Sequence, residues 1–329
     1  MLSFIDLMGL PANINQMLLK NSYVFYLLFL NTLVLQAQPG DTIYSFTVYR
    51  DIKVSIDRTV PSFEKNKPTL LVFYALPNGN TTAQTMGKKM AAGDDWHFDI
   101  QHIRAQTVFL RKALPKKNIV VVYLENDYKS WPLWKQKHPQ FGDSIKRVVD
   151  TIASLFHNPV IYLNGHSGGG SFIFGYLKGV KAIPTTVRRI SFIDSDYGYD
   201  STYTGQLLDW LKHKRHYLTV FAYNDSVALY NGKAVVSATG GTWYRSHLLL
   251  KHLSDDYTMR LEENDSMVIV KSSNKRIQFF FKLNPYRKIF HTQQVELNGF
   301  IHSILCGTKK DSKGYHYYGP RAYNEFIVE

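Results

Sequence analysis

Cysteine is almost absent from this chain of 329 residues, in which Cys306 is the only one. A single thiol cannot form a disulfide within the chain, so a packed core must stabilise the fold. Hydrophobic residues make up 45% of the sequence, which is enough to build such a core. The chain also lacks internal repeats and low-complexity tracts, and this excludes repeat architectures and compositionally biased chains.

The apolar run near the start of the chain is too short to span a bilayer. It extends from Tyr23 to Leu35, about 13 residues, whereas a spanning helix needs about 20. The run follows Lys20 and ends in Leu35-Gln36-Ala37, a pattern typical of a secretory signal peptide; Met17 is an alternative start. We expect a leader at residues 1–37, a single domain at 38–329, and a secreted or periplasmic protein. The alternatives are an uncleaved anchor and a buried first helix.

Acidic residues are few relative to basic ones, 26 against 39, and the formal net charge is +13. Such an excess favours anionic surfaces or substrates. The basic residues are scattered, however, and no zinc-finger or RNA-binding motif accompanies the short clusters at 211–216 and 271–276. We therefore expect no nucleic-acid partner, and we expect an acidic envelope or glycan environment instead.

After the leader, apolar runs alternate with amphipathic runs, which is typical of an α/β domain. Residues 42–58 alternate with a period of two and predict an opening antiparallel pair. Continuous apolar runs predict buried strands, and stripes spaced by three and four residues predict helices. The expected strands are 68–76, 118–126, 160–164, 189–194, 217–225, 267–273, 276–283 and 288–297, and the expected helices are 99–114, 143–156, 171–177, 207–211 and 242–253. The expected sheet has about eight strands.

A cluster of glycines around one serine lies between an expected strand and an expected helix. The segment reads Gly165-His166-Ser167-Gly168-Gly169, which matches the G-x-S-x-G nucleophile elbow in the context that the motif requires. A phosphate loop is excluded because no Gly-Lys-Ser/Thr follows, and no G-x-G-x-x-G can be aligned here. A glycine turn holding an idle serine is the structural alternative.

On this motif the chain resembles the α/β-hydrolase superfamily, and the likeness covers nearly everything after the leader. The resemblance implies an α/β-hydrolase fold, with a mostly parallel sheet and helices on both faces, and a nucleophile, acid and histidine in that order. Ser167 is the implied nucleophile. His302 is the implied base, because it follows the last expected strand; His291 and His316 are the alternatives. Asp225, after the strand at 217–225, is the implied acid, and Asp194 is the alternative.

The same resemblance implies an oxyanion hole made by two backbone amides. The amide of Gly168 follows the serine, and the loop at 74–82 supplies Leu76 or Asn78, because Pro77 has no amide hydrogen. An ordinary β-turn is the alternative for this loop. The residues expected to line the substrate pocket are His166, Asp194, Asp196 and Trp131.

The acidic segment at 93–99 resembles a metal site, yet acidic residues are also favoured at a helix start. We expect no metal and no organic cofactor. The predicted function is an exported serine hydrolase that cleaves an ester, carbohydrate- or envelope-linked, through a Ser-His-Asp triad. A peptidase or amidase of the same fold, and a non-catalytic binding protein of that fold, are the alternatives. The substrate would accordingly be a small molecule, a glycan or a peptide.

Overall fold

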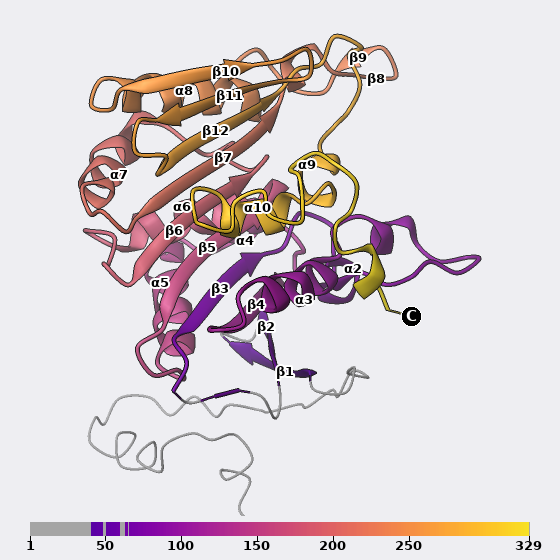
Figure 1. Ribbon diagram of the computed structural model, residues 1–329, viewed down its shortest axis with the longest axis vertical. Helices are drawn as coiled ribbons and strands as arrows, with labels where there is room; N and C mark the ends of the chain where they lie inside the picture. The colour runs from indigo at the N-terminus through magenta and orange to yellow at the C-terminus, as the bar shows by residue number, and fades with distance from the viewer. Residues whose placement is uncertain (1–40, 49–50, 60–62, 65, 329) are drawn as a thin grey trace, which may run out of the picture.

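The computed structural model describes residues 41–48, 51–59, 63–64 and 66–328. The expected leader at 1–37 lies outside these residues. Ten of the described strands form one mixed sheet in the order β1-β2-β4-β3-β5-β6-β7-β12-β11-β10 (Figure 1). They are β1 (Asp41–Val48), β2 (Ile52–Thr59), β3 (Thr69–Ala75), β4 (Asn118–Asn126), β5 (Val160–His166), β6 (Val187–Ile193), β7 (Tyr217–Tyr223), β10 (Met259–Glu263), β11 (Met267–Ser272) and β12 (Ile277–Lys282).

The centre of the sheet is parallel and its two margins are antiparallel. Strands β4, β3, β5, β6, β7 and β12 run in one direction. The hairpin of β1 and β2 flanks one side, and β11 and β10 flank the other. The expected opening antiparallel pair is therefore present, and the sheet has ten strands in place of about eight.

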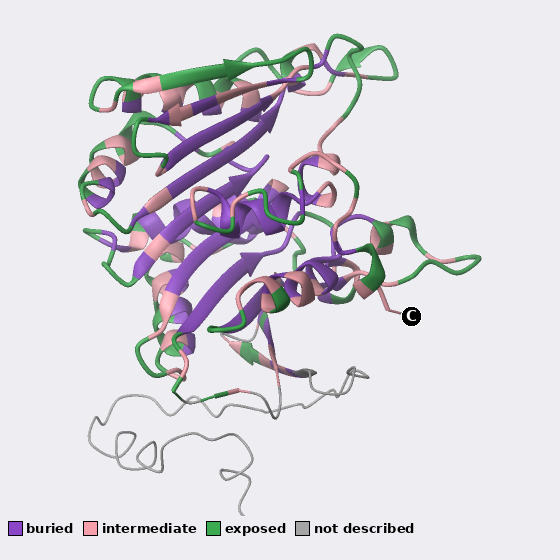
Figure 2. Cartoon of the chain, viewed as in Figure 1, coloured by how far each residue is buried: buried purple, intermediate pink, exposed green. Residues whose placement is uncertain are grey.

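Helices cover both faces of this sheet, which confirms the expected fold class. They are α2 (Thr82–Met86), α3 (Ile103–Ala113), α4 (Trp131–Lys137), α5 (Phe141–Ala153), α6 (Gly170–Gly179), α7 (Thr204–Leu211), α8 (Thr242–Ser254), α9 (Gln293–Glu296) and α10 (Gly299–Leu305). Apolar residues of α4 to α8 belong to one core cluster, and those of α3 and α10 belong to another. The central strands lie between the two clusters and are buried (Figure 2), as continuous apolar runs such as β3 require.

The parallel strands bring distant parts of the chain to one edge of the sheet. Ala75 pairs with Gly165, His166 with Ile193, and Tyr223 with Lys282. The carboxyl ends of β3, β5, β6, β7 and β12 therefore meet, and the loops that follow them are neighbours. In open α/β sheets this edge is where ligands bind.

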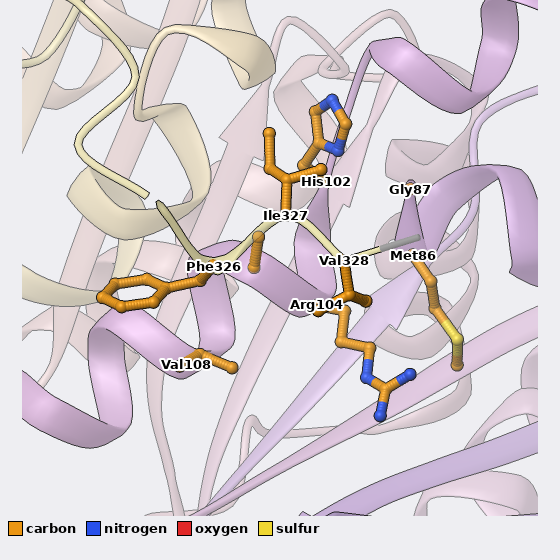
Figure 3. A pocket seen from close by; sticks show the side chains of 9 residues that line it. Met86, Gly87, His102, Arg104, Val108, Phe326, Ile327 and Val328 are labelled. Carbon is orange, nitrogen blue, oxygen red and sulfur yellow. The ribbon is translucent and has the colours of Figure 1, made fainter. Parts of the chain in front are cut away.

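The last described residues pack on α3, on the face that also carries α10 (Figure 1). The amide of Lys89 donates to the carbonyl of Val328 at 2.6 Å. Figure 3 shows the small pocket at this junction, lined by His102, Arg104 and Phe326 among others. Its volume of about 10 Å³ is sufficient for roughly one water, so it is a packing defect rather than a substrate pocket. Within the described part of the chain, no helix is both long and apolar enough to cross a membrane.

Candidate active site

Ser167 lies on a sharp turn between β5 and α6. Its φ angle is +55°, in the left-handed region that a non-glycine residue rarely adopts and that costs about 1 kcal/mol or more. Ser167 is half-buried, whereas His166 and Gly168 on either side are buried. The strained turn therefore turns the serine toward solvent at the carboxyl edge of the sheet.

The glycines after Ser167 are required by close backbone contacts. A Cβ atom on Gly169 would overlap the carbonyl oxygen of Ala75 at the end of β3. A Cβ atom on Gly170 would overlap the carbonyl oxygen of Ser195, just after β6. The elbow is thus wedged between its two neighbouring strands, and side chains at these positions would push it out of place.

A histidine and an aspartate are paired beside this turn, and they are His291 and Asp194. Nδ1 of His291 donates to Oδ2 of Asp194 in a short hydrogen bond. Asp194 directly follows β6 and is fully buried, whereas His291 lies in the turn after β12 with 23% of its side chain exposed. A hydrogen bond at Nδ1 fixes the tautomer and leaves Nε2 to accept a proton.

His166 holds His291 next to the elbow. Nε2 of His166 donates to the carbonyl oxygen of His291 at 3.1 Å, and the two rings lie 4.6 Å apart. Burial, and then the neighbouring His291, lower the pKa of His166 well below its usual value, so His166 is neutral. Because His166 immediately precedes Ser167, this contact connects the histidine of the pair directly to the nucleophile turn.

The structure does not pair His302 with Asp225, and this expectation is corrected. His302 lies within α10 and is buried, with its Nδ1 2.9 Å from the hydroxyl of Tyr315. The rings of Phe280 and Tyr317 pack around it at 4.7 and 5.3 Å. Burial lowers the pKa of His302 to about 4, which describes a neutral core histidine.

The expectation that His302 is the base depends on the segment 288–297, which the sequence pattern predicts to be the last strand. Ile289, His291, Gln293 and Val295 alternate along it, but the segment forms turns and the short helix α9. The last strand is β12, and it ends at Lys282, before Asn284-Pro285. An Asn-Pro pair is a turn signal, and the first histidine after it is His291.

Asp225 lies at the carboxyl edge, as expected, but it binds a helix instead of a histidine. Its two carboxylate oxygens accept from the amides of Thr242 at 2.7 Å and Trp243 at 3.3 Å. These are the first residues of α8, so Asp225 caps that helix. Burial, and then the charge of Asp194, raise the pKa of Asp225 to about 6.

The loop after β3 lies against the elbow, but the Leu76 amide is already used. It donates to the carbonyl of Leu124 at 3.1 Å as an extension of the sheet, so the expectation that it faces an oxyanion is corrected. A Cβ atom on Gly168 would overlap the side chain of Asn78, which places Asn78 directly against Gly168. Asn78 is therefore the residue of this loop that remains for an oxyanion hole.

Two of the residues expected to line a substrate pocket are core residues. Trp131 begins α4 and is only 1% exposed, packed on Trp134 and Phe172 with ring centroids 5.5 and 4.7 Å away. Asp196 is fully buried and accepts from the hydroxyl of Ser246 at 2.8 Å; burial raises its pKa well above the usual value.

Several aromatic side chains outside the expected pocket residues are exposed to solvent. Trp96, Tyr230 and Tyr286 are 62%, 65% and 77% exposed. Tyr230 belongs to the β8 (Leu229–Tyr230) and β9 (Lys233–Ala234) hairpin, whose Leu229 amide donates to the carbonyl of Arg287 at 3.1 Å. That bond joins the loop after β7 to the loop that carries His291.

No family model matches this chain, and no curated protein is significantly similar to it. Among solved structures it is similar to a thermostable esterase, with 13% identity over 75% of this chain and a TM-score of 0.44. The chain spans only 56% of the length of that esterase. It is also similar to a siderophore hydrolase from Aspergillus nidulans, with 10% identity, a TM-score of 0.45, and 87% and 99% of the two chains covered. An acetyl xylan esterase described as putative, from Bacteroides fragilis, gives 10% identity, a TM-score of 0.35, and 58% and 50% coverage. These values are too low to transfer an activity to this chain.

Proposed function

We propose that this protein is a serine hydrolase that cleaves esters with Ser167 as nucleophile, His291 as base and Asp194 as the acid. One observation carries the proposal: the His291–Asp194 pair is held, through His166, beside a serine on a strained strand-to-helix turn. A nucleophile, a base and a group that orients the base are the parts that acyl transfer requires. The sequence offers Asp194 as the alternative acid and His291 as an alternative base.

In the proposed reaction, Oγ of Ser167 attacks the ester carbonyl while Nε2 of His291 takes its proton. The C–O bond to the leaving group then breaks, and His291 returns the proton to the departing alcohol. Water, activated by His291, hydrolyses the acyl-enzyme and frees Ser167. Asp194 keeps the imidazole in the correct tautomer and stabilises it when it is charged.

We further propose that the amides of Gly168 and Asn78 bind the oxyanion of the tetrahedral intermediate. The contact between these two residues supports this assignment, since both amides belong to loops that meet beside Ser167. Fixed donors of this kind stabilise the charge that develops in the transition state, and each is worth about 3 kcal/mol.

The substrate class that we propose is an ester carried by a glycan or another envelope component, in an exported protein. The support is a net charge of +13, the exposed side chains of Tyr230 and Tyr286 on the two segments that the Leu229–Arg287 hydrogen bond joins, one of which leads to His291, and the leader pattern. Aromatic rings offer flat apolar surfaces for stacking, and a positive surface attracts acidic material.

The test is hydrolysis of p-nitrophenyl acetate by protein without residues 1–37, compared with the Ser167→Ala variant. We expect turnover by the wild type and a loss of at least about 10³-fold in the variant, since only binding and the oxyanion hole remain. Equal rates would contradict the proposal and favour a binding protein. A matched panel of acetate esters and amides then separates an esterase from a peptidase.

A further inference from the structure

The acid of the proposed triad makes a second hydrogen bond, to a residue that has no part in the reaction steps above. One carboxylate oxygen of Asp194 accepts from His291, and the other accepts from the hydroxyl of Thr242 in a short hydrogen bond. Asp194 and Thr242 are both fully buried. The orientation of the carboxylate is therefore set by two partners on opposite oxygens.

Thr242 is itself fixed in position by the second buried carboxylate. It is the first residue of α8, and its amide donates to Asp225 at 2.7 Å. Asp225 lies two residues after the end of β7, which is the neighbour of β6 in the sheet, and Asp194 directly follows β6. A Cβ atom on Gly241 would overlap the Asp225 carboxylate, so the start of the helix is seated tightly on this group.

The hydroxyl of Thr242 links Asp225, which lies after β7, to Asp194, the acid of the proposed triad. The Thr242 oxygen lies 3.3 Å from Asp225 while its proton is donated to Asp194. A helix N-terminus favours nearby negative charge, which allows two carboxylates to be buried side by side. We propose that Thr242, seated by Asp225, is a positioning residue that fixes Asp194 in the orientation needed to hold His291. This inference rests on the proposed function.

The next turn of the same helix provides a matched control. The hydroxyl of Ser246 donates to Asp196 at 2.8 Å, and both residues are fully buried. The bond is of the same kind as the bond from Thr242 to Asp194, and it comes from the same helix. No hydrogen bond joins Asp196 to His291 in the described part of the structure, so removing this bond should affect stability alone.

The experiment compares Thr242→Val, Thr242→Ser and Ser246→Ala in protein without residues 1–37. For each variant, kcat and KM for p-nitrophenyl acetate and the thermal midpoint are measured. We expect kcat of Thr242→Val to fall by about 10- to 100-fold with KM within about twofold, because groups that orient a catalytic residue cost this much when they are removed. Thr242→Ser keeps the hydroxyl and should stay within about threefold of the wild type. Ser246→Ala should keep its kcat within about twofold even where its thermal midpoint falls.

The proposal is overturned if Thr242→Val keeps the same kcat as Ser246→Ala, or if Thr242→Ser loses as much as Thr242→Val. Should Thr242→Val not fold, Thr242→Cys replaces it, because a thiol is a weak donor; a kcat equal to that of Thr242→Ser would then count against the proposal. These results can be distinguished from a failure of the proposed function. If the wild type and Ser167→Ala hydrolyse the ester equally, the proposed function has failed. If the wild type is active and Ser167→Ala is inactive, the Thr242 variants test the role of Thr242 alone.

Discussion

Two histidines near the end of the chain, His291 and His302, look alike in the sequence but have different surroundings in the structure. His302 has aromatic rings on several sides and a tyrosine hydroxyl at Nδ1. His291 has a buried carboxylate at Nδ1 and is partly open to solvent. A general base needs both a partner that orients it and access to the reacting group. Only His291 of these two meets both requirements.

The two aspartates at the carboxyl edge, Asp194 and Asp225, should likewise differ in their effect on kcat. We expect Asp194→Asn to lower kcat for p-nitrophenyl acetate by about 10³- to 10⁴-fold, because an amide presents the wrong hydrogen-bonding pattern to the imidazole. Asp225→Asn acts only through α8 and should lower kcat by about 10-fold or less. Steady-state kinetics of the two folded variants measures the difference, and a larger loss in Asp225→Asn would contradict the assignment of the acid.

At the scale of residues, the sequence predicts Ser167 as the nucleophile and leaves a few candidates each for the acid and the base. The motif around Ser167 has a specific meaning because glycines are required by backbone contact at set positions. Asp194 and His291 were among the alternatives, but the choice between them and Asp225 and His302 depends on which side chains meet across the sheet. Thr242 could not have been predicted, since a threonine at a helix start is ordinary and its partners come from two other strands.

At the scale of elements, the start of α8 and Asp225 form one unit whose stability depends on pH. The pKa of Asp225 is about 6 in the folded protein, against about 3.9 in an unfolded chain. The folded protein therefore binds this proton more tightly. The resulting stabilisation is fully present below about pH 4 and is lost as the pH rises through about 6, a difference of ~3 kcal/mol in the free energy of unfolding.

We expect Asp225→Asn, which cannot ionise, to lose less stability than the wild type between about pH 4.5 and pH 7.5. Urea denaturation at both pH values measures the free energy of unfolding. Asp209→Asn is a suitable control, because Asp209 is 75% exposed and pairs with Lys212 on the surface. If wild type and Asp225→Asn show the same pH dependence, the buried carboxylate at position 225 does not titrate as described.

Most elements were predicted closely, because buried strands and amphipathic helices have clear periods. The strand at 118–126 matches β4, and the helix at 242–253 matches α8 to within one residue. Residues 131–137, to which the sequence pattern assigns no helix or strand, form α4, which starts with a Ser130 cap and Pro132 in its first turn. Strand β10 was missed because its sequence MRLEE is mostly exposed at the sheet margin, where no apolar pattern is required.

At the scale of the whole molecule, the proposed active site depends on the meeting of five loops that are far apart in the sequence. The parallel order of β3, β5, β6, β7 and β12 brings them to one edge (Figure 1). The alternation of strands and helices predicts this class of fold. It does not predict which loop side chains touch, because that depends on strand register and on the turn after each strand.

The expected leader at residues 1–37 also belongs to this scale, and both its presence and its removal stay predictions. When the full chain is expressed in a bacterium with a periplasm, we expect export and cleavage between Ala37 and Gln38, because a basic residue, an apolar run and small residues occur in that order. The mass and N-terminal sequence of the exported protein test this. Leu28→Arg, which interrupts the apolar run, is the control that should block export. An uncleaved chain starting at Met1 or Met17 would contradict the prediction.

The central claim is that Ser167 is activated by His291, and labelling with a fluorophosphonate measures this activation directly, because only an activated serine reacts readily. The labelling rate is compared among wild type, His291→Ala and His302→Ala, with the modified residue located by mass spectrometry. The account predicts modification at Ser167, a loss of at least about 10³-fold in His291→Ala, and near wild-type labelling in folded His302→Ala. Unchanged labelling of His291→Ala, or modification at another residue, would contradict it.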